Sequence, residues 1–131
     1  MKVVDASVIA SFILKEPEWR RLSEIILNSY SVDHAIKETL NAIWKAYKRK
    51  YISLEDAKIK SSATFELFNF SLNMVNENQL LKEAFDLACS TNLTVYDALY
   101  VALAKIKNAV LYTLDRKQAE KVEGLIEVKL L

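Results

Sequence analysis

Glycine, proline, cysteine and histidine each occur only once in the 131 residues, and these scarcities exclude several kinds of site. The single glycine, Gly124, excludes glycine-rich phosphate-binding loops and the Gly-x-Ser-x-Gly element of many hydrolases, because each motif needs at least two glycines. One histidine, His34, and one cysteine, Cys89, are too few for a zinc site built on several such ligands. A lone cysteine also cannot form an internal disulfide, and we therefore expect a reducing, cytoplasmic environment.

A large charge of one sign and a long hydrophobic run are also absent. The 18 Lys and Arg residues nearly balance the 17 Asp and Glu residues, so a nucleic acid or an anionic membrane would need a local basic patch. No apolar stretch approaches the roughly 20 residues that span a bilayer. The apolar run after Lys2 is interrupted by Asp5, unlike a secretory signal. We therefore expect no membrane association, and the length predicts a single domain over residues 1–131.

Short apolar segments alternate with longer helical patterns along the chain. This alternation predicts an α/β fold, helix-rich and three-layered (α/β/α), around a short-stranded and mainly parallel central sheet. In the helix that begins at His34, an apolar stripe is expected to face the core, formed by Ile36, Leu40, Ile43 and Tyr47. We expect strands at residues 3–4, 68–74, 109–114 and 126–130, and helices over residues 6–14, 17–29, 34–50, 53–68, 77–90, 95–106 and 115–123.

Three aspartates each have both a structural and a functional explanation. Asp5 and Asp115 follow predicted strands and can cap the next helix, and Asp97 fits a capping box opened by Thr94. In a parallel sheet, however, Asp5 and Asp115 lie at the carboxyl edge, where open α/β folds bind ligands. Asp97 begins a helix so apolar over residues 98–104 that it is expected to be central. Gathering buried carboxylates is costly without cations, and a divalent metal would compensate for that cost.

Glu38 is a fourth candidate acid. It lies outside the apolar stripe of its helix, and Ala35 and Ala42, about one turn away, leave room for its carboxylate to lean inward. The alternative, a solvated glutamate beside Asn41 and Lys45, is equally compatible with the spacing. Spacing alone leaves both interpretations open.

Four segments that contain these acids resemble the four motifs of the PIN domain, and most closely those of VapC-type toxins. The segments are Asp5-Ala6-Ser7-Val8, Glu38-Thr39-Leu40-Asn41-Ala42, Thr94-Val95-Tyr96-Asp97-Ala98-Leu99-Tyr100 and Thr113-Leu114-Asp115-Arg116. They occur in the family's order and span essentially the whole chain. One departure is the sequence Val32-Asp33-His34, where family members often carry a proline before the glutamate.

The resemblance implies a Mg²⁺- or Mn²⁺-dependent endoribonuclease that acts as the toxin of a toxin–antitoxin pair. Its catalytic and metal-binding acids would be Asp5, Glu38, Asp97 and Asp115. Ser7 and Thr113 match the polar positions beside the first and last acids, where a hydroxyl can orient a carboxylate or a metal-bound water. The resemblance also implies a homodimer and an antitoxin that binds across the active-site groove. Large apolar residues that such interfaces can use are Trp19, Trp44, Phe65, Phe68 and Phe70.

Basic residues at two places are candidates for RNA binding. Arg116 and Lys117 directly follow Asp115 and are well placed to hold a substrate phosphate. Lys45, Lys48 and Arg49 end a helix, where they either complement the helix dipole or form a phosphate-binding patch. His34 is expected to be a surface residue, with a general base as the alternative, and Cys89 a small buried one.

Other proteins also gather acids at strand ends. Two such classes are phosphoacceptor receiver domains and haloacid-dehalogenase-like phosphatases, and both require a further acid near Asp5, where this chain has Ala6 and Ser7. A receiver domain also requires a lysine after the strand that ends near Thr113, and no lysine is suitably placed there. A PIN fold that only binds is disfavoured because all four acids are present. A housekeeping RNA-processing nuclease remains the alternative to a toxin. A small open reading frame immediately upstream, encoding a DNA-binding antitoxin, would decide between them.

Overall fold

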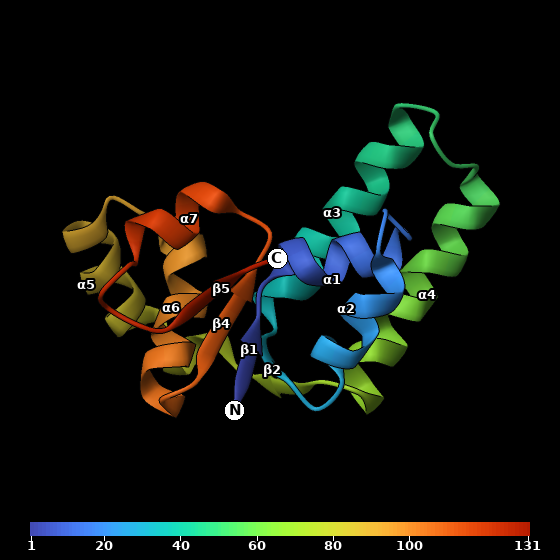
Figure 1. Ribbon diagram of the computed structural model, residues 1–131. Coiled ribbons are helices and arrows are strands. Elements are labelled where there is room, and N and C mark those ends of the chain that lie inside the picture. Colours follow the sequence, from blue (N-terminus) through green and yellow to red (C-terminus); the bar gives the residue numbers. More distant parts are fainter.

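A single sheet of five short parallel strands forms the centre of the molecule (Figure 1). The computed structural model describes all residues, 1–131. Every neighbouring pair of strands is parallel, and the strand order is β3-β2-β1-β4-β5. The strands are β1 (Lys2–Val4), β2 (Tyr30–Val32), β3 (Asn73–Val75), β4 (Val110–Thr113) and β5 (Val128–Leu130). The predicted α/β class with a short-stranded parallel sheet is confirmed.

Helices cover both sides of this sheet and complete the three layers (Figure 1). On one side lie α1 (Ala6–Ile13), α2 (Trp19–Ile26), α3 (His34–Lys48) and α4 (Leu54–Phe70), and on the other lie α5 (Leu81–Thr91), α6 (Val95–Lys107) and α7 (Arg116–Lys121). A 3-10 turn (Glu77–Gln79) precedes α5. Parallel strands are connected by right-handed crossovers, so the two directions in which the chain crosses the sheet place their helices on opposite faces. None of these helices combines the length and the apolarity that a membrane crossing requires.

The chain reverses its direction across the sheet between β1 and β4. From β1 the chain moves outward to β2 and β3, then returns to β4 on the other side of β1 and continues to β5. Val4 pairs with Tyr112, and the Asp5 backbone N–H donates to the Tyr112 carbonyl at 3.4 Å. Open α/β sheets bind ligands beyond the carboxyl ends of the strands at such a reversal. The segments after β1 and β4 therefore meet where a site is expected.

The core is a cluster of 28 buried hydrophobic residues, and α6 contributes most of its own length to it. All seven residues over 98–104 are buried, which confirms that this helix is central. Its first turn, which precedes the buried segment, reaches the carboxyl edge of the sheet, and so it can present Asp97 there without exposing the apolar segment.

Two strands differ from the sequence prediction. The alternating segment 68–74 is not one strand, because Phe68 and Phe70 form the end of α4 and β3 begins only at Asn73. Phe68 is one helical turn after the buried Thr64, and this spacing buries both on the same helical face. The unpredicted strand β2 contains Ser31, whose hydroxyl donates to the Val4 carbonyl at 2.8 Å.

Some predicted side-chain positions and helix limits were also wrong. The buried face of α3 contains Ala35, Thr39 and Ile43. The other residues of the predicted apolar stripe are only partly buried, namely Ile36, Leu40 and Tyr47. Cys89 is exposed on α5. The second helix is shorter than predicted, since α2 begins at Trp19 and ends at Ile26.

Candidate functional site

Asp5 is fixed at the carboxyl end of β1 by hydrogen bonds to both oxygens of its carboxylate. Oδ1 accepts from the Ser7 N–H at 3.1 Å, from the Val8 N–H at 3.3 Å and from the Ser7 hydroxyl, and Oδ2 accepts from the Thr113 hydroxyl. Asp5 is therefore the N-cap of α1, as the structural interpretation predicted. Its residue is only 3% exposed, and this burial raises the pKa of Asp5 to about 6 even though the Ser7 and Thr113 hydroxyls oppose the shift.

Ser7 and Thr113 link the carboxylate to the segment after β4. The Ser7 hydroxyl accepts from the Leu114 N–H at 3.0 Å, and the Thr113 hydroxyl accepts from the Asp115 N–H at 3.0 Å. Each hydroxyl thus donates to Asp5 and accepts from the backbone of the β4–α7 turn. This arrangement fixes the direction of the carboxylate and the start of α7 together.

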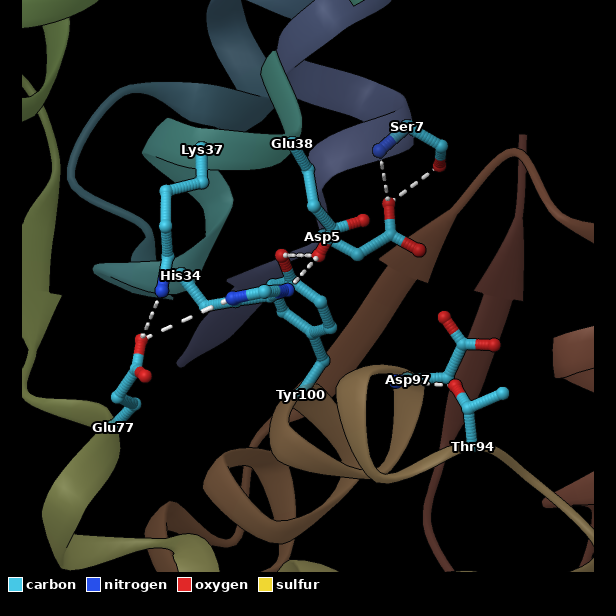
Figure 2. Close-up of polar contacts among 9 residues, drawn as sticks. All are labelled: Asp5, Ser7, His34, Lys37, Glu38, Glu77, Thr94, Asp97 and Tyr100. Atoms are coloured by element: carbon cyan, nitrogen blue, oxygen red, sulfur yellow. Dashed lines mark hydrogen bonds and ion pairs between the residues drawn. The ribbon is translucent and has the colours of Figure 1, made fainter. Parts of the chain in front are cut away.

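Glu38 points from α3 toward the same edge and has two partners (Figure 2). Its Oε1 accepts from the Tyr100 hydroxyl at 2.8 Å and lies 3.2 Å from His34 Nε2. Burial raises the pKa of Glu38, the Tyr100 hydrogen bond and His34 oppose that shift, and the negative charge of Asp97 adds to it. The deeply buried Tyr100 has a strongly raised pKa, because burial and Glu38 both disfavour its anion, so it remains a hydrogen-bond donor.

Asp97 lies in the first turn of α6, and Asp115 is the N-cap of α7. The Asp97 N–H donates to the Thr94 hydroxyl at 3.1 Å, so Thr94 is the predicted N-cap of α6 (Figure 2). Asp115 caps α7 by accepting from the Gln118 N–H at 3.1 Å. Partial burial raises the pKa of Asp97, and the nearby charge of Asp115 raises it further.

The four acids form one repelling group. Glu38 raises the pKa of Asp5, Asp97 raises that of Glu38, and Asp115 raises that of Asp97. Asp5, Asp97 and Asp115 form no salt bridge with any Lys, Arg or His. The four predicted acids, which come from four different segments of the sequence, are therefore close enough for each to influence the next in this series.

The donor set fits a hard divalent cation such as Mg²⁺ or Mn²⁺, which prefers carboxylate oxygens and water. With the present side-chain positions, no group of three or more His, Cys, Asp and Glu residues is placed to hold a metal ion. Asp115 uses only one carboxylate oxygen to cap α7, which leaves its other oxygen without a hydrogen-bond partner.

His34 is not the surface residue that we predicted from its place at a helix start. It is only 9% exposed, and its Nδ1 lies 4.0 Å from Glu77 on the side opposite to Glu38 (Figure 2). The His34 ring also stacks on Tyr96, with centroids 5.0 Å apart and planes inclined by 14°. Sequence reasoning gave His34 a role at the site only as the alternative of a general base, and it did not single out Tyr96 or Tyr100. The available signal was their spacing, since His34 and Glu38, like Tyr96 and Tyr100, are four residues apart and share a helix face.

The candidate RNA-binding residues lie at two distances from the acids. Arg116 and Lys117 are exposed in the first turn of α7, directly after Asp115. Lys45, Lys48 and Arg49 are exposed at the far end of α3, where the α3–α4 hairpin projects from the body (Figure 1). A pocket of about 520 Å³ opens at this tip and is lined by Tyr47, Lys48, Lys50, Tyr51, Ile52 and Ser53.

Comparison with known proteins gives both sequence relatives and the same fold. A match to the PIN domain family covers residues 2–124. Ribonuclease VapC3 of Pyrobaculum aerophilum is 35% identical over 127 residues, which are 95% of this chain and 96% of the relative. Exonuclease VapC9 of the same organism is 28% identical over 98% of this chain and 91% of the relative. A solved toxin–antitoxin complex from Klebsiella pneumoniae contains a chain with a TM-score of 0.70 and 15% identity, with 98% of this chain and 96% of that chain covered.

Proposed function

The chain is a PIN-domain protein of the VapC ribonuclease family, and from this membership we propose that it is a Mg²⁺- or Mn²⁺-dependent endoribonuclease and the toxin of a VapBC-type pair. The observation that carries the proposal is the group of four carboxylates at the edge of the sheet where β1 and β4 end, three of which form no salt bridge. Within this group, Glu38 raises the pKa of Asp5, Asp97 raises that of Glu38, and Asp115 raises that of Asp97. A protein has little reason to hold such a group together unless a cation binds it.

Within this proposal, Asp5 and Asp97 bind the ion directly, and Glu38 and Asp115 bind it directly or through water. The ion would neutralise the carboxylates, activate water as the nucleophile and offset charge on the phosphate and the leaving oxygen. Ser7 and Thr113 orient Asp5, because each donates a hydroxyl hydrogen bond to one of its oxygens.

Other side chains of the chain hold Glu38 and the RNA. Tyr100 and His34 both contact Glu38 Oε1, which leaves Oε2 free for the ion or its water. Arg116 and Lys117 hold a phosphate of the substrate near the acids. The cluster of Lys45, Lys48 and Arg49 at the hairpin tip binds phosphates farther along the strand, because helix geometry places Lys48 roughly 15 Å from Glu38.

Two protein partners belong to the same proposal, an antitoxin and a second copy of the chain. The resemblance to VapC toxins and the fold shared with a chain of a toxin–antitoxin complex support the antitoxin. Exposed aromatic side chains support a protein interface on the α3–α4 side, since Trp44 is 53% exposed, Phe65 46% and Phe70 85%, whereas Phe68 is buried. A cytoplasmic location agrees with an RNA substrate and with a single, unpaired Cys89.

The experiment that tests this function uses a circular single-stranded RNA, which has no ends. We expect the purified protein to linearise it in Mn²⁺ or Mg²⁺ and to stop when EDTA is added. Asp97→Asn should abolish cleavage, whereas Asp86→Asn, which removes the same charge from an exposed position on α5, should cleave like the wild type. Degradation of linear RNA only would contradict an endonuclease and favour an exonuclease. No metal-dependent cleavage of either RNA would contradict the proposal altogether.

A further inference from the structure

Two helices meet at the site through two matched pairs of side chains. On α3, His34 and Glu38 are one turn apart, and on α6, Tyr96 and Tyr100 are one turn apart. His34 stacks on Tyr96 with ring centroids 5.0 Å apart, and Glu38 accepts a hydrogen bond from Tyr100 at 2.8 Å. The contact of Glu38 and Tyr100 is partly buried, because Tyr100 is buried and Glu38 is only partly so. The contact of His34 and Tyr96 lies at the rim, because Tyr96 is exposed.

Tyr96 differs from every other aromatic side chain near the acids. It is 61% exposed, although one face of its ring lies against His34, so the accessible part is the opposite face and the edge. The His34 ring behind it is itself buried and is held by Glu38 and Glu77. Tyr96 is therefore an exposed aromatic surface with a fixed orientation.

This surface borders the acids directly. An open pocket of about 450 Å³ is lined by His34, Glu38, Thr94, Tyr96 and Asp97. The Tyr96 ring and two of the four carboxylates thus face the same space, and Tyr96 is the neighbour of Asp97 in the first turn of α6. A group that stacks on Tyr96 would lie within one nucleotide of a phosphate held at the acids.

We propose that Tyr96, backed by His34, is the stacking platform for a nucleobase next to the scissile phosphate, and this inference rests on the proposed ribonuclease function. An RNA base has a flat π-face that stacks on an exposed aromatic ring, and such platforms bind single strands with little sequence preference. The acids and basic residues recognise phosphate and metal alone. Tyr96 supplies the contact that distinguishes a nucleotide with an unpaired base from a bare phosphodiester.

The test compares binding of two single-stranded oligonucleotides of about ten nucleotides, one of adenosine and one abasic, which carry the same charge but differ in their bases. Affinity is measured by fluorescence anisotropy in EDTA, so that no RNA is cleaved. For Tyr96→Ala we expect a loss of about 5- to 150-fold in affinity for the adenosine strand and no change for the abasic strand. Tyr96→Phe, which keeps the ring, should bind both strands like the wild type.

Phe85→Ala is the matched control, because Phe85 on α5 is 59% exposed and lies outside the pocket of the acids. It should change neither affinity, and circular dichroism should show all variants folded. If Tyr96→Ala binds the adenosine strand as tightly as the wild type, or weakens both strands equally, the platform is wrong and Tyr96 is left for a protein partner. Wild-type cleavage of circular RNA, measured in parallel, separates the two ideas. If the wild type cleaves circular RNA but Tyr96→Ala keeps its affinity for the adenosine strand, only the stacking platform is wrong. If Tyr96→Ala loses that affinity but the wild type cleaves no RNA, only the proposed nuclease activity is wrong.

Discussion

The substitution Asp5→Asn tests whether the carboxylate of Asp5 serves to bind a metal ion or to stabilise the fold. Burial raises the pKa of Asp5 from an ordinary value of 3.8 to about 6. Because the folded-state pKa is the higher one, the folded protein binds more protons between these values, and its stability falls as the pH rises through them. At about 1.36 kcal/mol per pKa unit, the ionised Asp5 costs the folded protein about 3 kcal/mol at neutral pH. Asn removes this charge and is itself a good N-cap.

In EDTA at about pH 7.5, we expect Asp5→Asn to be more stable than the wild type by about 2 kcal/mol. The variant gains about 3 kcal/mol because the buried charge is removed. It loses about 1 kcal/mol because the amide makes a poorer hydrogen bond to the Ser7 or Thr113 hydroxyl. At about pH 4.5, most folded wild-type molecules hold the proton on Asp5, so removing its charge stabilises the variant by only about 1 kcal/mol. This gain equals the loss from the poorer hydrogen bond, and the two proteins should then be equally stable. Urea unfolding at both pH values measures this difference. Mn²⁺ should stabilise the wild type and have much less effect on the variant.

The same variant should not cleave RNA in Mn²⁺. Asp86→Asn serves as the control here too, because it removes an exposed charge and should show neither the pH-dependent gain nor the loss of activity. A variant that is less stable than the wild type at both pH values would show that the carboxylate of Asp5 supports the fold. Undiminished cleavage would reject its role at the metal.

Metal position and RNA affinity give two further tests. A crystal grown with Mn²⁺ should show the ion on oxygens of Asp5 and Asp97, and carboxylates more than about 8 Å apart, too far to share an ion even through a water, would rule this out. Replacing the basic residues 48–50 with Ser should weaken RNA binding and flatten its salt dependence, because fewer counterions are released, with little change in cleavage at saturating RNA. An unchanged affinity with an unchanged salt slope would mean that these charges do not contact RNA.

The strands and acids that could be placed from sequence are those with strong local signals. The apolar residues before Asp5 and Asp115 identify β1 and β4, and the parallel arrangement then places both acids at one edge. For these two, the structure confirms the helix cap, and this does not exclude the proposed role as a metal ligand. Capping uses only part of a carboxylate, so the same residue can do both.

What the sequence did not reveal depends on contacts between distant segments. The strand β2 is three residues long and contains Ser31, whose burial is possible only because Val4 offers a carbonyl. The position of His34 at a helix start predicts a surface residue, but Glu77 and Tyr96 from distant parts of the chain pack against it. The apolar residues at the end of α4 fit both the period of a strand and the period of a helix. The structure has the helix there, because Phe68 follows Thr64 by one turn and both are buried on the same helical face.

Three of the four acids share one further property, which is their place at the start of a helix, and the fourth lies one turn farther in. Asp5 and Asp115 cap α1 and α7, Asp97 lies in the first turn of α6, and Glu38 follows in the second turn of α3. Each helix begins with backbone N–H groups that carry about half a positive charge between them. The backbone itself therefore supplies positive potential where the carboxylates converge. This lowers the cost of assembling the acids before any cation binds, and it leaves a residual attraction for the phosphate once the carboxylates are neutralised.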